Sequence, residues 1–166
     1  MAISNAQYLK GQYDVTKALG AKVISSDFTF VIDGYEPNYL LCKQAPEPEL
    51  SSAGEIEVPL PLGAMMYQPQ QVKVAHQGPV AFFETVQGSI DNMMINLLTT
   101  GAIFNATLYE GTPQRFLKAK RLRDCFLQLD NPDRDWENRA QVLMFTGTLF
   151  FHYFGEVLPG NSSDYN

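Results

Sequence analysis

The 166-residue chain is predicted to be mainly β, an antiparallel β-barrel or sandwich with one flanking α-helix and long loops. Short segments rich in aromatic and β-branched residues recur between Gly and Pro turn signals, which is typical of antiparallel strands. Only one segment, residues 89–100, shows a clear helical period. The length suits one domain over residues 1–166, with enough chain to bury a core without disulfide or metal support.

The first half of the chain is predicted to contain a hairpin and a long loop. Residues 28–32 form a predicted strand that ends at an Asp-Gly turn signal, so we expect residues 39–44 to return as the second strand. Residues 45–61 interleave prolines with glutamates. Because proline has no N–H to give to a sheet, this Pro/Glu-rich segment is expected to be an exposed loop or an excursion at a sheet edge.

A helix follows two further strands. Residues 72–77 and 80–87 are predicted strands on either side of a Gly-Pro pair. From residue 89 to residue 100, apolar side chains fall at i, i+3, i+4, i+7 and i+8 and so form one continuous face. Ser89 is the expected N-cap and Gly101 the expected stop. A lone helix with one apolar face must lie against a sheet.

Three long β segments complete the chain. Residues 104–108 alternate between apolar and polar side chains, and residues 116–129 form a longer segment with a bend or turn expected near Leu122. Residues 142–154 are either one strand or two strands that meet at Gly147. The expected total is eight or nine strands and one helix, which favours a barrel or sandwich.

Composition disfavours several classes of function. The 12 basic residues against 18 acidic ones give a net charge of −6, which disfavours a general nucleic-acid binder. Cys42 and Cys125 belong to no CxxC pair and are expected to be buried, reduced thiols. With no secretory signal pattern and no run of about 20 apolar residues, we expect a protein that folds in a cytoplasm, without a membrane segment.

Catalytic motifs are missing from the sequence. His76 and His152 are the only histidines, and neither has a carboxylate or cysteine partner at a ligand spacing. The nucleophile-elbow, P-loop and dinucleotide-binding patterns do not occur. We therefore expect no enzyme activity, no cofactor and no metal site, and a half-buried strand position is the ordinary expectation for His152.

Charge is concentrated between residues 115 and 139, where a basic cluster precedes an acidic one. One interpretation is a solvated hairpin whose ion pairs each contribute only about a few tenths of a kcal/mol. The other is a bipolar surface that joins copies of the chain in a fixed register. Phosphate binding is disfavoured by the neighbouring acids. The hypothetical inter-subunit contacts are Arg115, Lys118, Lys120, Arg121, Arg123, Asp130, Asp133, Arg134, Asp135, Trp136, Glu137 and Arg139.

Large apolar side chains exceed the needs of one small core. The chain has eleven Phe, eight Tyr and six Met, residue types that supply contact area at subunit interfaces. Trp136, the only tryptophan, has polar neighbours and either folds back onto the core or lies in an interface. Asymmetric contacts of this kind, repeated head to tail, produce rings or filaments.

The segments between residues 55 and 156 resemble those of a known protein family in their pattern and in their order. The matching segments are residues 56–59, 80–87 with the helix after them, 111–130, 131–139 and 146–156. In this order they resemble the tail tube proteins of contractile-tailed bacteriophages, a family that shares its fold with type VI secretion needle proteins.

The resemblance implies a structural virion protein of the phage tail, assembled in the cytoplasm of the host bacterium. Six subunits would form a ring, and rings would stack into a tube through which DNA passes without specific binding. The implied partners are further copies of this chain and the sheath, tape-measure, baseplate and tail-terminator proteins.

Three parts of the chain take roles under this resemblance. Residues 1–20 would be an arm that orders on assembly, and residues 45–61 would be a stacking or sheath-facing loop. The acids proposed to face the lumen are Glu84, Glu110 and Asp124. Two alternatives remain open: a tube-like baseplate or tail-completion ring protein, and, from a different class, a small β-barrel ligand-binding protein.

Overall fold

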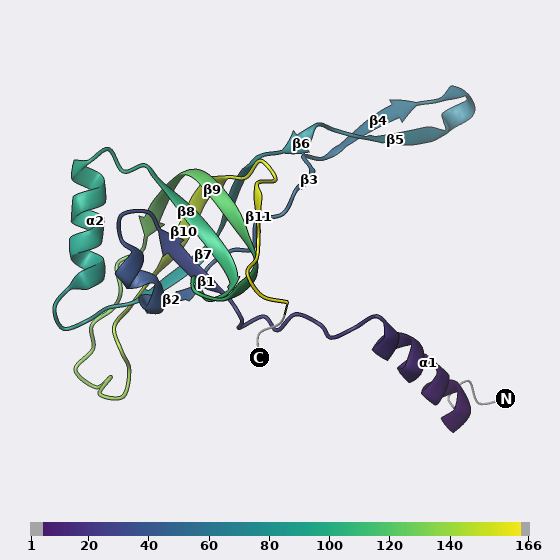
Figure 1. The fold of residues 1–166 in the computed structure, drawn as a ribbon. Coiled ribbons are helices and arrows are strands. Elements are labelled where there is room, and N and C mark those ends of the chain that lie inside the picture. The colour runs from purple at the N-terminus through teal and green to yellow at the C-terminus, as the bar shows by residue number, and fades with distance from the viewer. Residues whose placement is uncertain (1–4, 164–166) are drawn as a thin grey trace.

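The structure, a computed structural model that describes residues 5–163, has one β-sheet body from which slender elements project (Figure 1). Strands of the body follow the order β1-β8-β9-β10-β7-β2, all antiparallel, and β11 also pairs with β9. The mainly β, antiparallel class is confirmed, and the path of described strands does not close into a barrel. The body strands are β1 (Thr29–Ile32), β2 (Cys42–Gln44), β7 (Ala75–Phe83), β8 (Phe104–Gly111), β9 (Phe116–Leu129), β10 (Met144–His152) and β11 (Val157–Pro159).

Helix α2 (Ser89–Thr99) covers the core, as its apolar period predicts. Ile90, Met93 and Leu97 are buried, and they belong to the same cluster as Phe82 of β7 and Leu122 of β9. The N-cap prediction is wrong by one residue: Gly88 occupies that position with a φ of 75°, and Ser89 is the first helical residue. The helix ends at the left-handed Gly101 as expected. Neither described helix is long and apolar enough to cross a membrane.

The predicted hairpin between residues 28–32 and 39–44 is wrong. β1 pairs with β8 and β2 pairs with β7, so the two strands lie at opposite ends of the sheet path. Between them the chain forms the 3-10 helix η1 (Glu36–Leu41), which has a proline as its second residue. η1 carries the chain from β1 at one end of the strand order to β2 at the other end. The chain therefore does not turn back at the Asp-Gly pair to form a strand beside β1.

The Gly78-Pro79 pair does not divide two strands, because β7 runs through it. β2 pairs with β7 only at Ala81 and Phe82, so Pro79 is not required to donate to a second neighbour. Pro46 lies directly over Gly78, where a Cβ would come within 2.3 Å of the proline ring. The glycine therefore makes room for residues 45–50 to run across β7.

β9 and β10 are each one continuous strand. β9 bends at Asp124, which has a φ of 46°, two residues beyond the expected position at Leu122. β10 passes through Gly147, where a Cβ would come within 2.1 Å of the Gln128 carbonyl oxygen on β9. Glycine alone permits this close approach of β10 to β9. Gly147 therefore lies within one continuous strand and does not divide residues 142–154 into two.

Of the two predictions for residues 45–61, the loop describes residues 45–50, whereas residues 51–52 and 55–59 are strands. Residues 51–73 form a two-stranded arm that extends from the body, and η2 lies at its tip (Figure 1). Proline is tolerated here because an isolated two-stranded ladder has free edges and the prolines lie at strand ends. The elements of the arm are β3 (Ser51–Ser52), β4 (Glu55–Pro59), η2 (Pro61–Gly63), β5 (Met65–Pro69) and β6 (Val72–Lys73).

The N-terminal segment contains a second helix that the sequence analysis did not predict. Helix α1 (Ala6–Ala18) begins at Asn5, whose side-chain oxygen accepts a hydrogen bond from the Tyr8 N–H at 2.8 Å. None of its residues is buried. It projects from the body on an extended segment (Figure 1).

Candidate assembly surfaces

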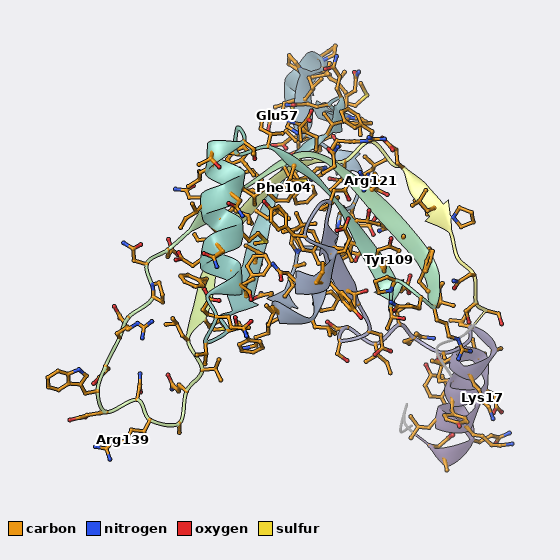
Figure 2. All side chains as sticks on the ribbon, turned by 60° about the vertical axis from the view of Figure 1, so that its left-hand side comes forward. Lys17, Glu57, Phe104, Tyr109, Arg121 and Arg139 are labelled. Carbon is orange, nitrogen blue, oxygen red and sulfur yellow. The ribbon has the colours of Figure 1, made fainter. Side chains whose placement is uncertain are left out.

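Three elements extend beyond the body: α1, the arm, and residues 130–143, which we call the acidic loop. Figure 2 shows Lys17 on α1 and Arg139 on the acidic loop well away from Phe104 at the core, and Glu57 on the arm, which Figure 1 shows extending from the body. Trp136 in the acidic loop is 97% exposed, so it does not fold back onto the core. Large apolar side chains exposed on slender elements are typical of surfaces that become buried on association.

The arm has two chemically different faces. In its register Ile56 lies opposite Gln68 and Val58 opposite Met66, so these four side chains share one face. Met65 lies across from Pro59 on the other face, which also contains Glu55, Glu57 and Tyr67. Ile56 and Met66 are 43% and 47% exposed. The arm is therefore amphipathic, with one mainly apolar face and one acidic, aromatic face.

The basic cluster of β9 is largely engaged within the subunit, beginning with Lys120. Its side chain is only 8% exposed, and its Nζ donates to Glu47 and Glu49 at 2.6 Å each and to the Pro48 carbonyl at 2.9 Å. The Nζ also lies 5.9 Å from the ring centre of Tyr153. Lys120 thus holds residues 47–49, the stem of the arm, on the middle of β9.

Two arginines of the same strand form forked ion pairs with carboxylates of the body. The Arg121 guanidinium binds both carboxylate oxygens of Asp33 and donates to Thr107 Oγ1 at 2.8 Å. The Arg123 guanidinium donates to the two carboxylate oxygens of Glu156 at 3.1 and 2.8 Å. Such forked pairs fix geometry as well as charge. Both arginines lie on β9, with Arg121 labelled in Figure 2.

The remaining two basic residues of the cluster lie toward the start of β9. Lys118 Nζ is 3.6 Å from Glu110, and Arg115 Nε donates to Ser162 Oγ at 3.0 Å. The local ion-pair interpretation therefore describes this cluster within one subunit. An inter-subunit role for the same residues stays a prediction.

The ion pairs shift the pKa values of their partners. The hydrogen bond from Lys120, followed by its charge, lowers the pKa of Glu49, and Arg123 lowers the pKa of Glu156 in the same way. Burial by itself lowers the pKa of Lys120, but the bonds to Glu47 and Glu49 outweigh burial and raise it. The Lys120–Glu49 and Arg123–Glu156 pairs thus favour the charged form of both members.

These pairs predict acid sensitivity of the body. Because the pKa values of Glu49 and Glu156 are lower in the folded chain than the ordinary 4.5, their stabilisation is complete above that pH and is lost as the pH falls through the folded values. We expect the melting temperature to fall below about pH 4.5. The double variant Glu49→Gln, Glu156→Gln should show a flatter dependence, measured by thermal denaturation between about pH 3 and 7. An unchanged slope in the variant would contradict the assignment.

The acidic loop leaves the body after β9. Its described hydrogen bonds are mostly short-range, such as that from the Glu137 N–H to the Asp135 carboxylate at 2.9 Å. The side chains proposed for inter-subunit contact lie along this exposed segment and near its start. They are Asp130, Asp133, Arg134, Asp135, Trp136, Glu137 and Arg139.

The acids proposed to face a lumen occupy three different environments. Glu84 accepts hydrogen bonds from the backbone N–H groups of Thr85, Ile90 and Asp91 at 2.8, 3.1 and 2.9 Å, so it caps α2. The side chain of Glu110 is 15% exposed and paired with Lys118, and Asp124 is exposed at the bend of β9. The helix cap gives Glu84 a structural role that the sequence analysis missed. The sequence signal for this role was the position of Glu84 a few residues before the N-terminus of α2, where a carboxylate is favoured.

The cysteines and histidines lie in ordinary structural positions. Burial raises the pKa of both the Cys42 and Cys125 thiols to about 12, which leaves them unreactive. The His76 ring stacks on Phe151 at 5.4 Å between ring centres. Among residues 5–163, no three His, Cys, Asp or Glu side chains gather in a group suited to a metal ion. The absence of enzyme activity stays a prediction.

No protein-family model and no curated protein sequence matches this chain. Solved structures do share its fold. A chain of the tube-terminating cap of the anti-feeding prophage has a TM-score of 0.57 at 13% identity, with 84% of this chain and 93% of that chain covered. A chain of the sheath–tube complex of an extracellular contractile injection system, PVC, in the extended state also has a TM-score of 0.57 at 13% identity, with 87% and 95% covered.

A chain of the sheath/tube terminator of the PVC system matches with a TM-score of 0.55 at 13% identity, over 84% of this chain and 97% of that chain. At this level of identity the likeness establishes a shared fold. The fold is that of chains found in the tube, cap and terminator assemblies of contractile injection systems.

Proposed function

We propose that this chain is a structural subunit of the tail tube of a contractile-tailed phage or a related injection system. Six copies form a ring, and rings stack into a hollow conduit for DNA. The observation that carries the proposal is the contrast between a packed body and three projecting elements with exposed apolar side chains. Tyr8 of α1, Met66 of the arm and Trp136 of the acidic loop are 50%, 47% and 97% exposed.

Elementary energetics supports association through these elements. A two-stranded hairpin by itself is at best marginally stable in water. A helix of 13 residues without tertiary contacts is also marginal. The arm and α1 therefore gain most of their stability from surfaces outside their own subunit, and further copies of the chain are the partners that the proposal names.

The comparisons support a tail role through the shared fold, since the similar chains come from tube, cap, terminator and baseplate assemblies. In this proposal the sheath, tape-measure, baseplate and tail-terminator proteins are the other partners. The net charge of −6 suits a conduit wall that repels phosphate and lets DNA slide. The chain has no catalytic role, and it assembles in the cytoplasm of the host bacterium and then resides in the tail.

A single-ring protein is the second candidate. Its support is specific: the similar structures include a tube-terminating cap, a terminator and a baseplate as well as a sheath–tube complex. Such a tube-like baseplate or tail-completion protein would use the same lateral contacts around one ring and would not stack into a long tube.

Negative-stain electron microscopy of the purified chain across a concentration series tests the proposal. Stacked rings or tubes with a central hole are the expected result. Isolated rings would instead favour the single-ring candidate. Monomers alone at the highest concentration would overturn both.

The exposed tryptophan gives a prediction for the acidic loop. Trp136→Ala should change the free energy of unfolding by no more than about 0.5 kcal/mol, since the side chain contacts little of its own subunit. Assembly should require on the order of tenfold more protein, because buried tryptophans dominate interfaces. The matched control is Val86→Ala, another fully exposed apolar side chain on a loop outside the proposed contacts. Light scattering at increasing concentration measures both variants, and equal behaviour would remove Trp136 from the interface.

A further inference from the structure

A groove of about 1020 Å³ lies between residues 23–28, β2 and the paired ends of β8 and β9. Much of its wall is apolar and comes from Val23, Ile24, Phe28, Leu108 and Tyr109. Val23 and Ile24 are 63% and 61% exposed, so the groove is open and presents uncovered aliphatic surface. The tube proposal as stated above assigns nothing to this groove.

Helix α1 has an apolar face that nothing in its own subunit covers. At 100° per residue, four apolar side chains of the helix and that of the C-cap residue fall within about 160° of the helix circumference, with Gln12 and Thr16 between them. Their exposed fractions range from 50% to 76%. The five are Tyr8, Leu9, Tyr13, Val15 and Leu19, and we call them the α1 stripe.

The composition and length of α1 make the helix only weakly stable without a surface to pack against. Gly11 lies in its middle and costs about 1 kcal/mol relative to alanine in an exposed helix. Thirteen residues are also close to the shortest length at which a helix persists alone in water. A helix of this kind is stabilised chiefly by packing of its amphipathic face.

We propose that the α1 stripe of one copy docks into this groove on a second copy. The inference rests on the proposed self-assembly and names the surfaces that mediate one of its contacts. Helix and groove are different surfaces, so the contact between two copies is head-to-tail. The same contact can repeat from each copy to the next around a closed ring.

Charge supports this pairing. Lys10 and Lys17 lie beside the Tyr13 edge of the α1 stripe, and α1 is net positive in a chain of net charge −6. The groove contains three acids, Asp27, Glu47 and Glu110, alongside two lysines, and of these acids Glu47 and Glu110 also pair with Lys120 and Lys118 of their own subunit. A positive helix is therefore attracted to the acidic body of another copy.

The path of the chain favours a second copy over the helix's own subunit. α1 ends where Gly20 takes a left-handed conformation with a φ of 86°, and its N–H donates to the Lys17 carbonyl at 3.0 Å. Residues 19–24 are exposed and extend from this point, so the helix projects away from the groove that begins at Val23 (Figure 1).

Photo-crosslinking of the full chain tests the proposal. Benzoylphenylalanine replaces Tyr13, and nitrogen-15-labelled chains are mixed with unlabelled chains before assembly and irradiation. Mass spectrometry should find crosslinks between labelled and unlabelled chains that join position 13 to residues 23–28, 43–47 or 108–110. Crosslinks only within one chain would show the helix folding onto its own groove, and crosslinks to other regions would show a different partner surface. Either outcome overturns the proposal.

Paired substitutions on α1 give a second readout. Val15→Asp places a charge in the α1 stripe and should raise the concentration needed for assembly at least tenfold. Gln7→Asp places the same charge on the polar side near the positive N-terminus and should leave that concentration within about twofold. Equal effects would overturn the docking. Electron microscopy of the same samples separates the two proposals: rings or tubes without the crosslinks refute only the docking, whereas monomers alone refute self-assembly itself.

Discussion

Met66→Glu will prevent assembly at concentrations where the unaltered chain forms rings or tubes, and Met65→Glu will not. The two methionines are neighbours on β5 with similar exposure, 47% and 55%, but they lie on opposite faces of the arm. Met66 shares the apolar face with Ile56 and Val58, whereas Met65 shares the face of Glu55 and Glu57. If the apolar face packs against another copy, burying a new carboxylate there costs about 3 kcal/mol or more.

A cost of that size raises the concentration for half-assembly by about two orders of magnitude. Sedimentation velocity across a concentration series measures it, and circular dichroism confirms that both variants stay folded. Folding should be unaffected, since each side chain is about half exposed on the arm. Equal loss of assembly in both variants would contradict an amphipathic arm. Normal assembly of Met66→Glu would remove the apolar face from the contact.

The second large effect concerns stability. The double variant Glu47→Gln, Glu49→Gln will lower the free energy of unfolding by about 3 to 5 kcal/mol, because it leaves the buried Lys120 ammonium without a carboxylate. For a chain of this size that loss corresponds to a fall of about 6 to 20 °C in melting temperature. Thermal denaturation near pH 7 measures it.

Lys120→Met is the matched control, and its effect should be much smaller. When the lysine is absent, Glu47 and Glu49 return to water, since their side chains are already 59% and 71% exposed. The methionine fills the space beside Tyr153 without a charge to satisfy. A destabilisation by Lys120→Met as large as that of the double variant would contradict the view that burial of the lysine dominates the energetics.

Short-range sequence patterns predicted those helices and strands in which apolar side chains recur at a clear helical or strand spacing. Helix α2 follows from the spacing of Ile90, Met93 and Leu97, and β8 follows from the alternation that begins at Phe104. These patterns depend on which face of an element is buried, and that information is present within a short stretch of sequence. The same reasoning predicted the extent of β9, and it placed β10 within residues 142–154 while leaving open whether that segment is one strand or two.

Pairing between distant strands was not predictable in this way. The partner of β1 is β8, about 75 residues further along, and no local pattern specifies it. The contacts of Lys120 with Glu47 and Glu49 span more than 70 residues and were missed for the same reason. The strands of the arm were not predicted, because prolines at strand ends cannot be distinguished in a sequence from prolines in a loop.

The residues proposed for contacts between copies were likewise predicted only where a local signal exists. A charged, aromatic acidic loop around Trp136 was found from composition, and the structure shows the side chain exposed. The apolar face of the arm was missed, although Ile56 and Val58 alternate with glutamates in a simple two-residue period. The α1 stripe was missed because its spacing is interrupted by Gly11 and by polar residues.

The central claim is that copies of this chain assemble into closed rings that stack. Sedimentation velocity of the unaltered chain over increasing concentration tests it most directly. We predict a species with six times the 18.6 kDa mass of one chain, which gives way to integer multiples of that ring as the concentration rises. A single 18.6 kDa species at every concentration would contradict the account.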